Sequence, residues 1–285
     1  MEFWIIQTYN GLSYAALLFL LGGGLSLIFG VMRVINVAQG SFYMVGGYVG
    51  YAVIGLTGNF YLAFLVACIS IGILGLVMER FFLRRLVGEN IRMMLATMGV
   101  ALFLRDLCFV IWGGNPLTLS VPEWLSGGLQ VGKLYFSTLR FFMILEAGVL
   151  FVLLWLFERK TRVGATVRAA VDNDETLEGF GVNVMLVRMG VFGLGALLTA
   201  FGGVLGCAFM SIYPGLDFEL LPFAFVVVIL GGIGSLPGAL IGAIIVGLID
   251  NFGKALFPEL SYFTIFAPMA IMLAIRPQGL FGRDI

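Results

Sequence analysis

Apolar runs of about 20 residues recur along almost the whole chain, and they restrict its fold more than any other feature. A run of this length crosses the ~30 Å hydrocarbon core of a bilayer as an α-helix, whereas a barrel strand needs about 10 alternating residues. Hydrophobic residues make up 61% of the 285 and charged residues 11%, with a mean hydropathy of +1.08. The sequence therefore predicts an all-α, polytopic membrane protein with about eight or nine transmembrane segments, some of them discontinuous.

We treat residues 1–285 as one membrane domain that contains a polar loop over 158–188. The seventh and eighth expected segments are too short to cross the bilayer upright, so they are either tilted spans or a re-entrant pair. The choice between these alternatives does not change the side of the membrane on which each chain end lies. The nine segments are 11–30, 37–56, 60–78, 94–112, 138–157, 189–210, 218–230, 237–250 and 262–275.

Basic residues are distributed unevenly between alternate loops. The positive-inside rule places the side with more Lys and Arg in the cytoplasm, so the amino terminus is expected outside and the carboxyl terminus inside. The outer loops are expected to carry Glu123, Asp217, Glu219, Asp250 and Glu259, with Lys133, Arg140 and Lys254 as their basic residues. The cytoplasmic set is Arg33, Arg80, Arg84, Arg85, Arg92, Arg159, Lys160, Arg162, Arg168, Arg188, Arg276 and Arg283.

The polar loop 158–188 is the longest interval that water-phase partners can reach. Gly164 is expected to give a flexible entry, followed by a short helix over 165–171 whose small side chains can lie in a groove on another protein. Asp172 and Glu175 have capping-box spacing and predict the start of a second short helix.

That second helix is expected to end near Gly179 or Gly181. Loops of about 30 residues are usually functional or disordered, and the apolar residues of this one argue against disorder. A solvated charged linker is the alternative. The apolar residues are Val163, Val167, Val171, Leu177 and Phe180.

Two glycine clusters contain polar or helix-breaking residues. The first runs from Asn36 to Gly46 and Gly47, and the second, 231–238, interrupts a hydrophobic stretch. Irregular backbone at membrane depth needs protein or a water-filled cavity around it, and one break in each half of a chain is typical of discontinuous helices that line a substrate path. Simple bends between closely packed helices are the alternative, because GxxxG spacings recur here.

Three charged residues are expected inside the membrane. Arg105 and Asp106 lie about seven residues from the outer end of the fourth segment, and Glu146 about nine residues from the outer start of the fifth. At about 1.5 Å per residue these depths agree, so an Arg105–Glu146 pair is a hypothesis, acting either as structural glue or as a gate.

Several kinds of chemistry are disfavoured. Residues 127–133 have the spacing of a phosphate-binding loop, but Leu134 stands where Ser or Thr must ligate magnesium. The sequence contains no histidine, which excludes a Ser–His pair and removes the commonest metal ligand. No catalytic residue, metal site, cofactor or nucleic-acid partner is therefore predicted. An ion-coupled secondary transporter with a relay through Arg105, Asp106 and Glu146 is an alternative, and a purely structural membrane protein is another.

Four segments, in this order, carry a resemblance over essentially the whole chain: VINVAQGSFYMVGGY, GATVRAAVDNDETLEGFGVN, VVVILGGIGSLPGALIGAIIVG and IRPQGLFGR. They resemble the membrane permeases of branched-chain amino acid ABC importers, and most closely the permease subunit type of the high-affinity system. The resemblance implies a permease subunit in a bacterial-type cytoplasmic membrane. Gln39 stands where many relatives have histidine.

The resemblance also implies partners: a second homologous permease subunit, two cytoplasmic ATP-binding subunits that hold ATP and magnesium, an extracytoplasmic substrate-binding protein, and membrane lipid. The substrate is a branched-chain amino acid or a related small amino acid, urea or amide. The coupling segment falls on Gly164, Arg168, Ala169, Ala170, Asp172, Asn173 and Gly181. The translocation region, with the adjoining Gly46 and Gly47, falls on Asn36, Gln39, Gly40, Tyr43, Gly231, Gly232, Gly234, Ser235 and Pro237.

Overall fold

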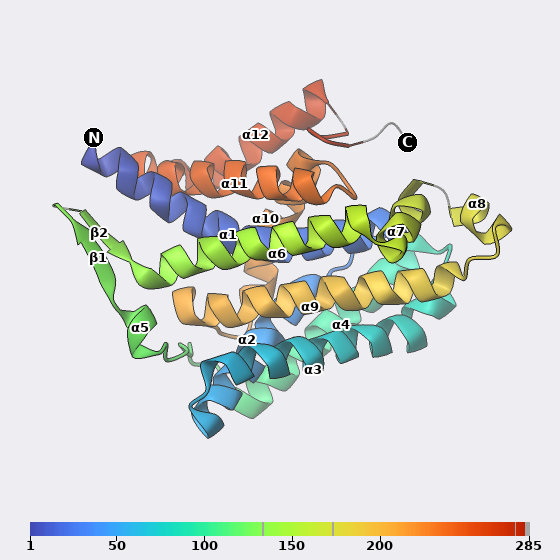
Figure 1. The fold of residues 1–285 in the computed structure, drawn as a ribbon, viewed down its shortest axis with the longest axis horizontal. Helices are drawn as coiled ribbons and strands as arrows, with labels where there is room; N and C mark the ends of the chain where they lie inside the picture. Colours follow the sequence, from blue (N-terminus) through green and yellow to red (C-terminus); the bar gives the residue numbers. More distant parts are fainter. Residues whose placement is uncertain (133, 173, 277, 283–285) are drawn as a thin grey trace.

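The computed structural model describes residues 1–132, 134–172, 174–276 and 278–282, and Figure 1 shows a bundle of helices. Nine helices in this part of the chain correspond one for one to the nine expected segments, so the predicted all-α fold is confirmed. They are α1 (Glu2–Met32), α2 (Ala38–Thr57), α3 (Phe60–Phe81), α4 (Asn90–Trp112), α6 (Thr138–Lys160), α9 (Val184–Met210), α10 (Leu216–Gly231), α11 (Leu236–Leu256) and α12 (Ser261–Ile275).

Short elements connect the long helices. A hairpin of β1 (Gly128–Val131) and β2 (Leu134–Ser137) pairs antiparallel, with Gly128 opposite Ser137, and leads into α6. The loop between α6 and α9 forms the two short helices that its sequence predicts. The short elements are η1 (Leu83–Leu86), α5 (Glu123–Ser126), α7 (Arg162–Asp172), α8 (Asp174–Gly179) and η2 (Pro258–Leu260).

Capping side chains explain why two helices begin where they do. The Asn59 side chain accepts a hydrogen bond from the Leu62 N–H (3.1 Å), and Asn183 accepts one from Leu186 N–H (3.2 Å). Each cap satisfies a backbone donor that has no partner within the helix. The second cap starts α9 at Val184, one turn before the apolar run begins, which is why the helix is longer than its apolar stretch predicts.

Six helices in the described residues are long and apolar enough to cross a membrane: α1, α3, α4, α6, α9 and α11. α10 and α12 are shorter than these, and α2 is less apolar. The chain is an integral membrane protein that combines complete spans with shorter or more polar helices.

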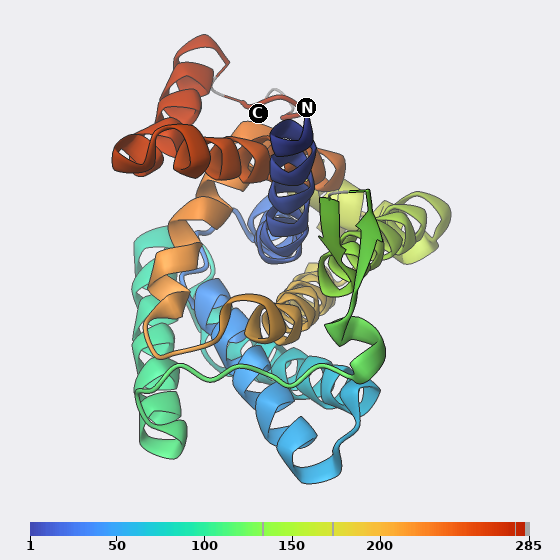
Figure 2. The same cartoon turned by 90° about the vertical axis from the view of Figure 1, so that its left-hand side faces the viewer.

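α1 forms the centre of the bundle. It packs against α11, α9, α10 and α6, and in Figure 2 it is surrounded by the other helices. In its most apolar 18-residue stretch, 83% of the residues are buried, compared with 22% in α4 and 11% in α6. A helix that is apolar on every side is expected in such a position. α4 and α6 therefore present wide apolar faces at the surface of the bundle.

Glycines bring α2 and α9 into close contact. A Cβ added to Gly46 would lie 2.7 Å from the Ala200 Cα, and one added to Gly203 would overlap the Tyr43 carbonyl oxygen. Small residues permit this backbone approach, which gives helices in lipid their van der Waals attraction. The packing function that GxxxG spacing predicts is therefore present at this interface.

A pair of substitutions on α9 tests this packing. Gly203→Ala is expected to lower the melting temperature of the detergent-solubilised protein, because overpacking costs about 1–3 kcal/mol. At Gly190 an added Cβ meets no atom within 4 Å, so Gly190→Ala is the matched control. That control should leave stability unchanged or raise it by about 0.5–1 kcal/mol. Size-exclusion chromatography after heating measures both; equal melting temperatures would contradict the interface.

Candidate functional site

The first polar break connects α1 to α2. α1 ends where Arg33 takes a left-handed backbone conformation (φ 53°), and the chain then runs without helix until α2 begins. The Asn36 side chain replaces one missing backbone bond, because its carbonyl oxygen accepts from the Ala38 N–H (3.2 Å); its amide donates to the Gln39 side chain (3.0 Å). Both polar side chains are buried.

Gln39 joins this break to α9. Its amide donates to the Gly195 carbonyl oxygen (3.1 Å) and to the Thr199 hydroxyl. Two turns of α2 beyond the break, Gly46 and Gly47 pack on α9, as does Tyr43, whose side chain is also buried. In this conformation these candidate pathway residues lie inside a packed interface rather than on an open surface.

The break reaches the middle of the membrane-spanning helices. The Ser41 hydroxyl, in the first turn of α2, lies 3.4 Å from the Ala101 carbonyl oxygen. Ala101 is eleven residues from each end of α4 (Asn90–Trp112), which is about 16 Å from either end at ~1.5 Å per residue. α2 therefore begins near mid-depth, a position that its sequence alone does not reveal.

The amino-terminal turns of α2 and α10 meet at this depth. A Cβ on Gly40 would overlap the backbone of Asp217, in the first turn of α10, and the Ser41 hydroxyl donates a 2.7 Å hydrogen bond to the Asp217 carboxylate. Helix amino termini carry partial positive charge, and discontinuous helices in transporters present such ends to anionic groups. Asp217 occupies that position from within the protein.

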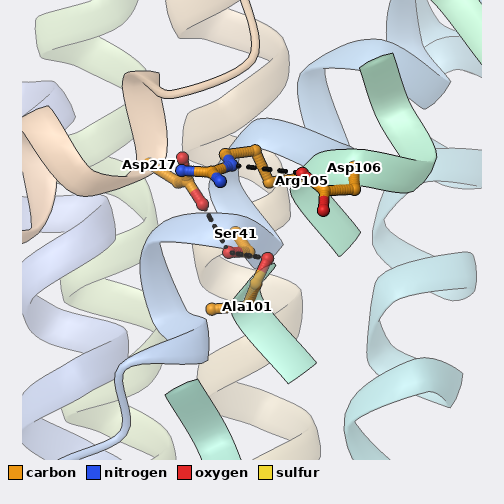
Figure 3. Close-up of polar contacts among 5 residues, drawn as sticks. All are labelled: Ser41, Ala101, Arg105, Asp106 and Asp217. Atoms are coloured by element: carbon orange, nitrogen blue, oxygen red, sulfur yellow. Dashed lines mark hydrogen bonds and ion pairs between the residues drawn. The ribbon is translucent and has the colours of Figure 1, made fainter. Parts of the chain in front are cut away.

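Arg105 extends from α4 toward the same carboxylate, as Figure 3 shows. Its guanidinium lies 5.6 Å from the centre of the Phe218 ring, and its Nε lies 3.5 Å from an Asp106 carboxylate oxygen. The Asp106 side chain is 74% exposed, whereas Asp217 is 2% exposed. Charges of both signs thus occupy the face formed by α4 and α10, well inside the membrane-spanning length.

The predicted pair of Arg105 with Glu146 is wrong. Arg105 lies beside Asp106 and Asp217, whereas Glu146 lies among aromatic residues of α3 and α6. Figure 2 shows α4 and α6 on opposite sides of the bundle. Two residues at equal depth along their helices lie at the same height in the membrane, but their side chains can face different sides of the bundle. The proton relay through Arg105, Asp106 and Glu146, on which the secondary-transporter alternative depends, is therefore interrupted between Asp106 and Glu146.

The sequence predicted that Asp217 and Asp250 lie in outer loops, and this expectation is wrong. Both residues lie in helices, and both are buried. Asp250 accepts a 2.7 Å hydrogen bond from Lys254, one turn along α11. Asp217 follows Gly215, whose positive φ (111°) starts α10. A glycine directly before an apolar run, with an acidic residue in the first turn, is the sequence signal that could have located this buried carboxylate.

The second polar break is a tight turn between α10 and α11, so the predicted interruption is confirmed as a helix boundary. Gly232 and Gly234 have positive φ angles (99° and 73°), which only glycine adopts without strain. The Ser235 hydroxyl accepts from the Gly238 N–H (3.1 Å) and caps α11, and Pro237 occupies its first turn, where the absent N–H is not needed.

The carboxyl-terminal segment covers this turn, a contact that sequence reasoning missed. The backbone N–H groups of Leu280 and Phe281 donate to the Leu230 and Gly231 carbonyl oxygens (2.9 and 3.0 Å). These carbonyl groups close α10, so they have no partner within the helix. Leu280 and Phe281 of the terminal IRPQGLFGR motif thus satisfy the open end of α10.

α7 lies against both breaks. A Cβ on Gly30, near the end of α1, would lie 2.6 Å from the Gly234 Cα and 3.5 Å from a Val171 methyl group. A Cβ on Gly234 would lie 3.3 Å from the other Val171 methyl, and the Arg33 guanidinium donates to the Val171 carbonyl oxygen (3.4 Å). The end of α7 therefore touches the end of α1 and the α10–α11 turn together.

Gly164 is not the flexible entry that the sequence had indicated, because it lies inside α7 and packs on the end of α6. A Cβ there would overlap the Phe157 and Glu158 carbonyl oxygens, and its N–H donates to the Thr161 hydroxyl (2.9 Å). This contact fixes the angle between α6 and α7.

The other coupling candidates differ in position. Ala170 is buried, and Arg168 lines a cavity of about 250 Å³ with residues of the α10–α11 turn and with Phe281. Ala169 packs beside Ala170 against the bundle, and Gly181 follows α8 with a positive φ (80°). Asn173 and the Asp172 side chain lie outside the described residues, so the predicted capping box is not described.

Helix ends that meet at mid-depth, mixed charges beside them and the short helix α7 packed on both breaks define a polytopic membrane transport protein. The chain belongs to the family described as the permease component of branched-chain amino acid transport systems, whose model matches residues 7–273. The resemblance carried by the four sequence motifs is thereby confirmed.

Individual relatives cover nearly the full chain. The high-affinity branched-chain amino acid permease BraD of Pseudomonas aeruginosa is 28% identical, over 97% of this chain and 95% of its own. LivH of Escherichia coli, named for the same transport, is 27% identical, over 99% and 96%. The ribose import permease RbsC of Escherichia coli is 26% identical, over 96% and 85%. No solved structure gives a significant match.

A charge exchange tests the geometry of the intramembrane charges. Arg105→Glu combined with Glu146→Arg is expected to recover no transport lost in the single variants, because the two positions face different sides of the bundle. Uptake in cells that lack the native gene measures this. As a control for expression, immunoblots of isolated membranes should show comparable amounts of each variant. Recovery to near wild-type uptake would contradict the arrangement of α4 and α6 in Figure 2.

Proposed function

We propose that the chain is the permease subunit of an ATP-binding cassette importer that passes a branched-chain amino acid, or a related small amino acid or amide, into the cytoplasm. Membership of the permease family and the names of BraD and LivH support this substrate class. RbsC, named for ribose import, shows that similar chains serve chemically different substrates. A separate binding protein on the outside then selects the substrate.

The observation that carries the proposal is the contact of α7 with both helix breaks. Val171 lies against Gly30 and Gly234, so a push on α7 reaches the end of α1 and the α10–α11 turn at once. α7 belongs to the polar loop that the positive-inside rule assigns to the cytoplasm. ATP-binding subunits, which hold the ATP and magnesium, would act there by favouring one of two permease conformations.

Two exposed apolar side chains on this loop mark the docking surface for the ATP-binding subunits. Phe180, just after α8, is 81% exposed, and Val163, in α7, is 59% exposed. The opposite side of α7, with Ala170, is buried against the membrane spans. The loop thus packs one side against the bundle and leaves these two apolar side chains exposed, which favours docking over a solvated linker.

The face of α4 and α10 with Arg105 and Asp106, behind which Asp217 is buried, forms the wall of the translocation path. Charged side chains at this depth are costly against lipid, so they normally face protein or a water-filled cavity. A second, homologous permease subunit on this face encloses the path between the two chains. Asn36, Gln39 and Tyr43 then enter the path when the α2–α9 interface rearranges during transport.

The position of the polar loop sets the orientation of the protein in the membrane. The end of α1, the α10–α11 turn, α7 and the carboxyl-terminal segment all meet at one end of the bundle, and Figure 1 shows the amino terminus at the other. With the arginine-rich loop in the cytoplasm, the amino terminus lies outside and the carboxyl terminus inside. The membrane is the cytoplasmic membrane of a bacterial-type cell.

Arg168→Glu and Gly164→Pro test the coupling role. Arg168→Glu places a negative charge in the cavity between α7 and the α10–α11 turn, and Gly164→Pro removes the N–H that bonds to Thr161. Substrate-stimulated ATPase activity of the reconstituted complex and cellular uptake are both expected to fall at least about tenfold, with membrane insertion intact. Wild-type activity in both variants would remove the proposed role of α7.

Phe180→Asp tests the docking surface. A charge in place of an exposed aromatic anchor is expected to weaken docking by about 2 kcal/mol or more, which is typical of a hot-spot residue, so recovery of the ATP-binding subunits with the tagged chain falls. Leu129→Asp is the matched control, since Leu129 is a similarly exposed apolar residue in the hairpin at the other end of the bundle. The proposal requires that only Phe180→Asp lose these subunits, as measured by quantitative mass spectrometry of the purified complex.

A further inference from the structure

Glu146 lies in a groove of about 230 Å³ that the transport function does not use. α3 and α6 form its two walls, and Phe201 of α9 lies between them; Figure 1 shows α3 and α6 on either side of α9. None of the described residues forms a hydrogen bond or an ion pair with the Glu146 carboxylate. A carboxylate at the apolar surface of a bundle is costly unless a cation or a donor meets it.

The walls around this carboxylate are aromatic. Tyr61, Phe64, Phe142 and Phe201 line the groove with Glu146. Aromatic faces attract cations through their quadrupoles, and sets of such rings beside a carboxylate are a typical site for organic ammonium groups. The chemistry of the groove therefore selects a cationic amine rather than an anion or a neutral polar group.

The groove extends from Glu146 toward the head-group region of one leaflet. Glu146 is eight residues from the start of α6 (Thr138–Lys160), about 12 Å along the helix, and helical side chains lean toward the amino terminus, so its carboxylate is directed toward the Phe142 end of the groove. Trp124 stacks on Tyr61 (6.5 Å between ring centres) and packs edge-on against Phe142 (5.5 Å). Trp and Tyr at this position mark the interface of the bilayer.

The groove becomes purely apolar away from this end. Val149 and Leu150 continue its lining along α6, and beyond them the exposed residues Val152, Leu153 and Leu156 extend the same apolar surface. A charged site near the interface followed by an apolar strip has the same polarity order as a phospholipid. A lysine from a neighbouring protein helix would account for the charge but not for this order.

We propose that the α3–α6 groove binds a lipid with an ammonium head group, of the phosphatidylethanolamine type, from the leaflet at the Thr138 end of α6. The ammonium group donates to the Glu146 carboxylate and lies against the aromatic rings. The Tyr61 hydroxyl, at the exposed rim, donates to the lipid phosphate, and an acyl chain follows Val149 and Leu150. This site lies on a different side of the bundle from the α4–α10 face.

Native mass spectrometry of the full-length protein, with any subunits that copurify, tests the proposal. The probe is an equimolar mixture of phosphatidylethanolamine and phosphatidylglycerol with the same acyl chains. The wild-type protein is expected to retain the ethanolamine lipid over the glycerol lipid by about tenfold, and Glu146→Gln is expected to abolish the preference. Glu146→Lys should reverse it. Glu259→Gln, which removes an exposed carboxylate elsewhere, is the matched control and should keep it.

Equal lipid preference in wild type and Glu146→Gln would overturn the proposal, and so would the same loss in Glu259→Gln. Phe142→Leu keeps the carboxylate and removes one ring, so it should weaken retention of the ethanolamine lipid severalfold even if Glu146 variants do not fold. A photoreactive amino acid in place of Val149 identifies the occupant directly. It should capture lipid; capture of a polypeptide, or displacement by soluble glycerophosphoethanolamine, would overturn the assignment to a bilayer lipid.

Discussion

Backbone polar groups have no water to bond with inside a bilayer, and the whole arrangement of this protein depends on that constraint. Each interruption of a helix must find partners elsewhere in the chain. At the first break the Asn36 side chain accepts from the Ala38 N–H, and the Thr97 hydroxyl of α4 accepts from the Val37 N–H. At the second, the N–H groups of Leu280 and Phe281 bond to the carbonyl groups that close α10. The two helix breaks, to which we assign functions, therefore lie where three or more segments of the chain pack together.

The same convergence places coupling and translocation elements in contact. Gly30 and Gly234 let the end of α1 approach the α10–α11 turn closely, and Val171 of α7 fills the remaining space. A larger residue at either glycine would push α7 away from the breaks. Small side chains here do more than increase packing: they keep the distance short between the loop that a motor can reach and the helix ends that must move.

The sequence predicted the nine hydrophobic helices, the two short helices of the polar loop and the turn near Gly234, because length, apolar content and glycine are local signals. It did not predict that α2 begins at mid-depth, since this depends on contacts of Ser41 and Gln39 with distant helices. The Arg105–Glu146 error has a related cause. Hydropathy gives a residue's height in the membrane, while the side of the bundle it faces depends on tertiary packing.

The burial of α1 has a consequence for biosynthesis. Helices of a membrane protein are inserted in the order in which they are made, and α1 is made long before α11, its most extensive neighbour. Until α11 arrives, the face of α1 that carries Gly11 and Ala15 is exposed to lipid or to the insertion machinery. The centre of this protein is therefore completed late. Damage to α11 would leave a chain that is fully inserted in the membrane and yet has no finished interior.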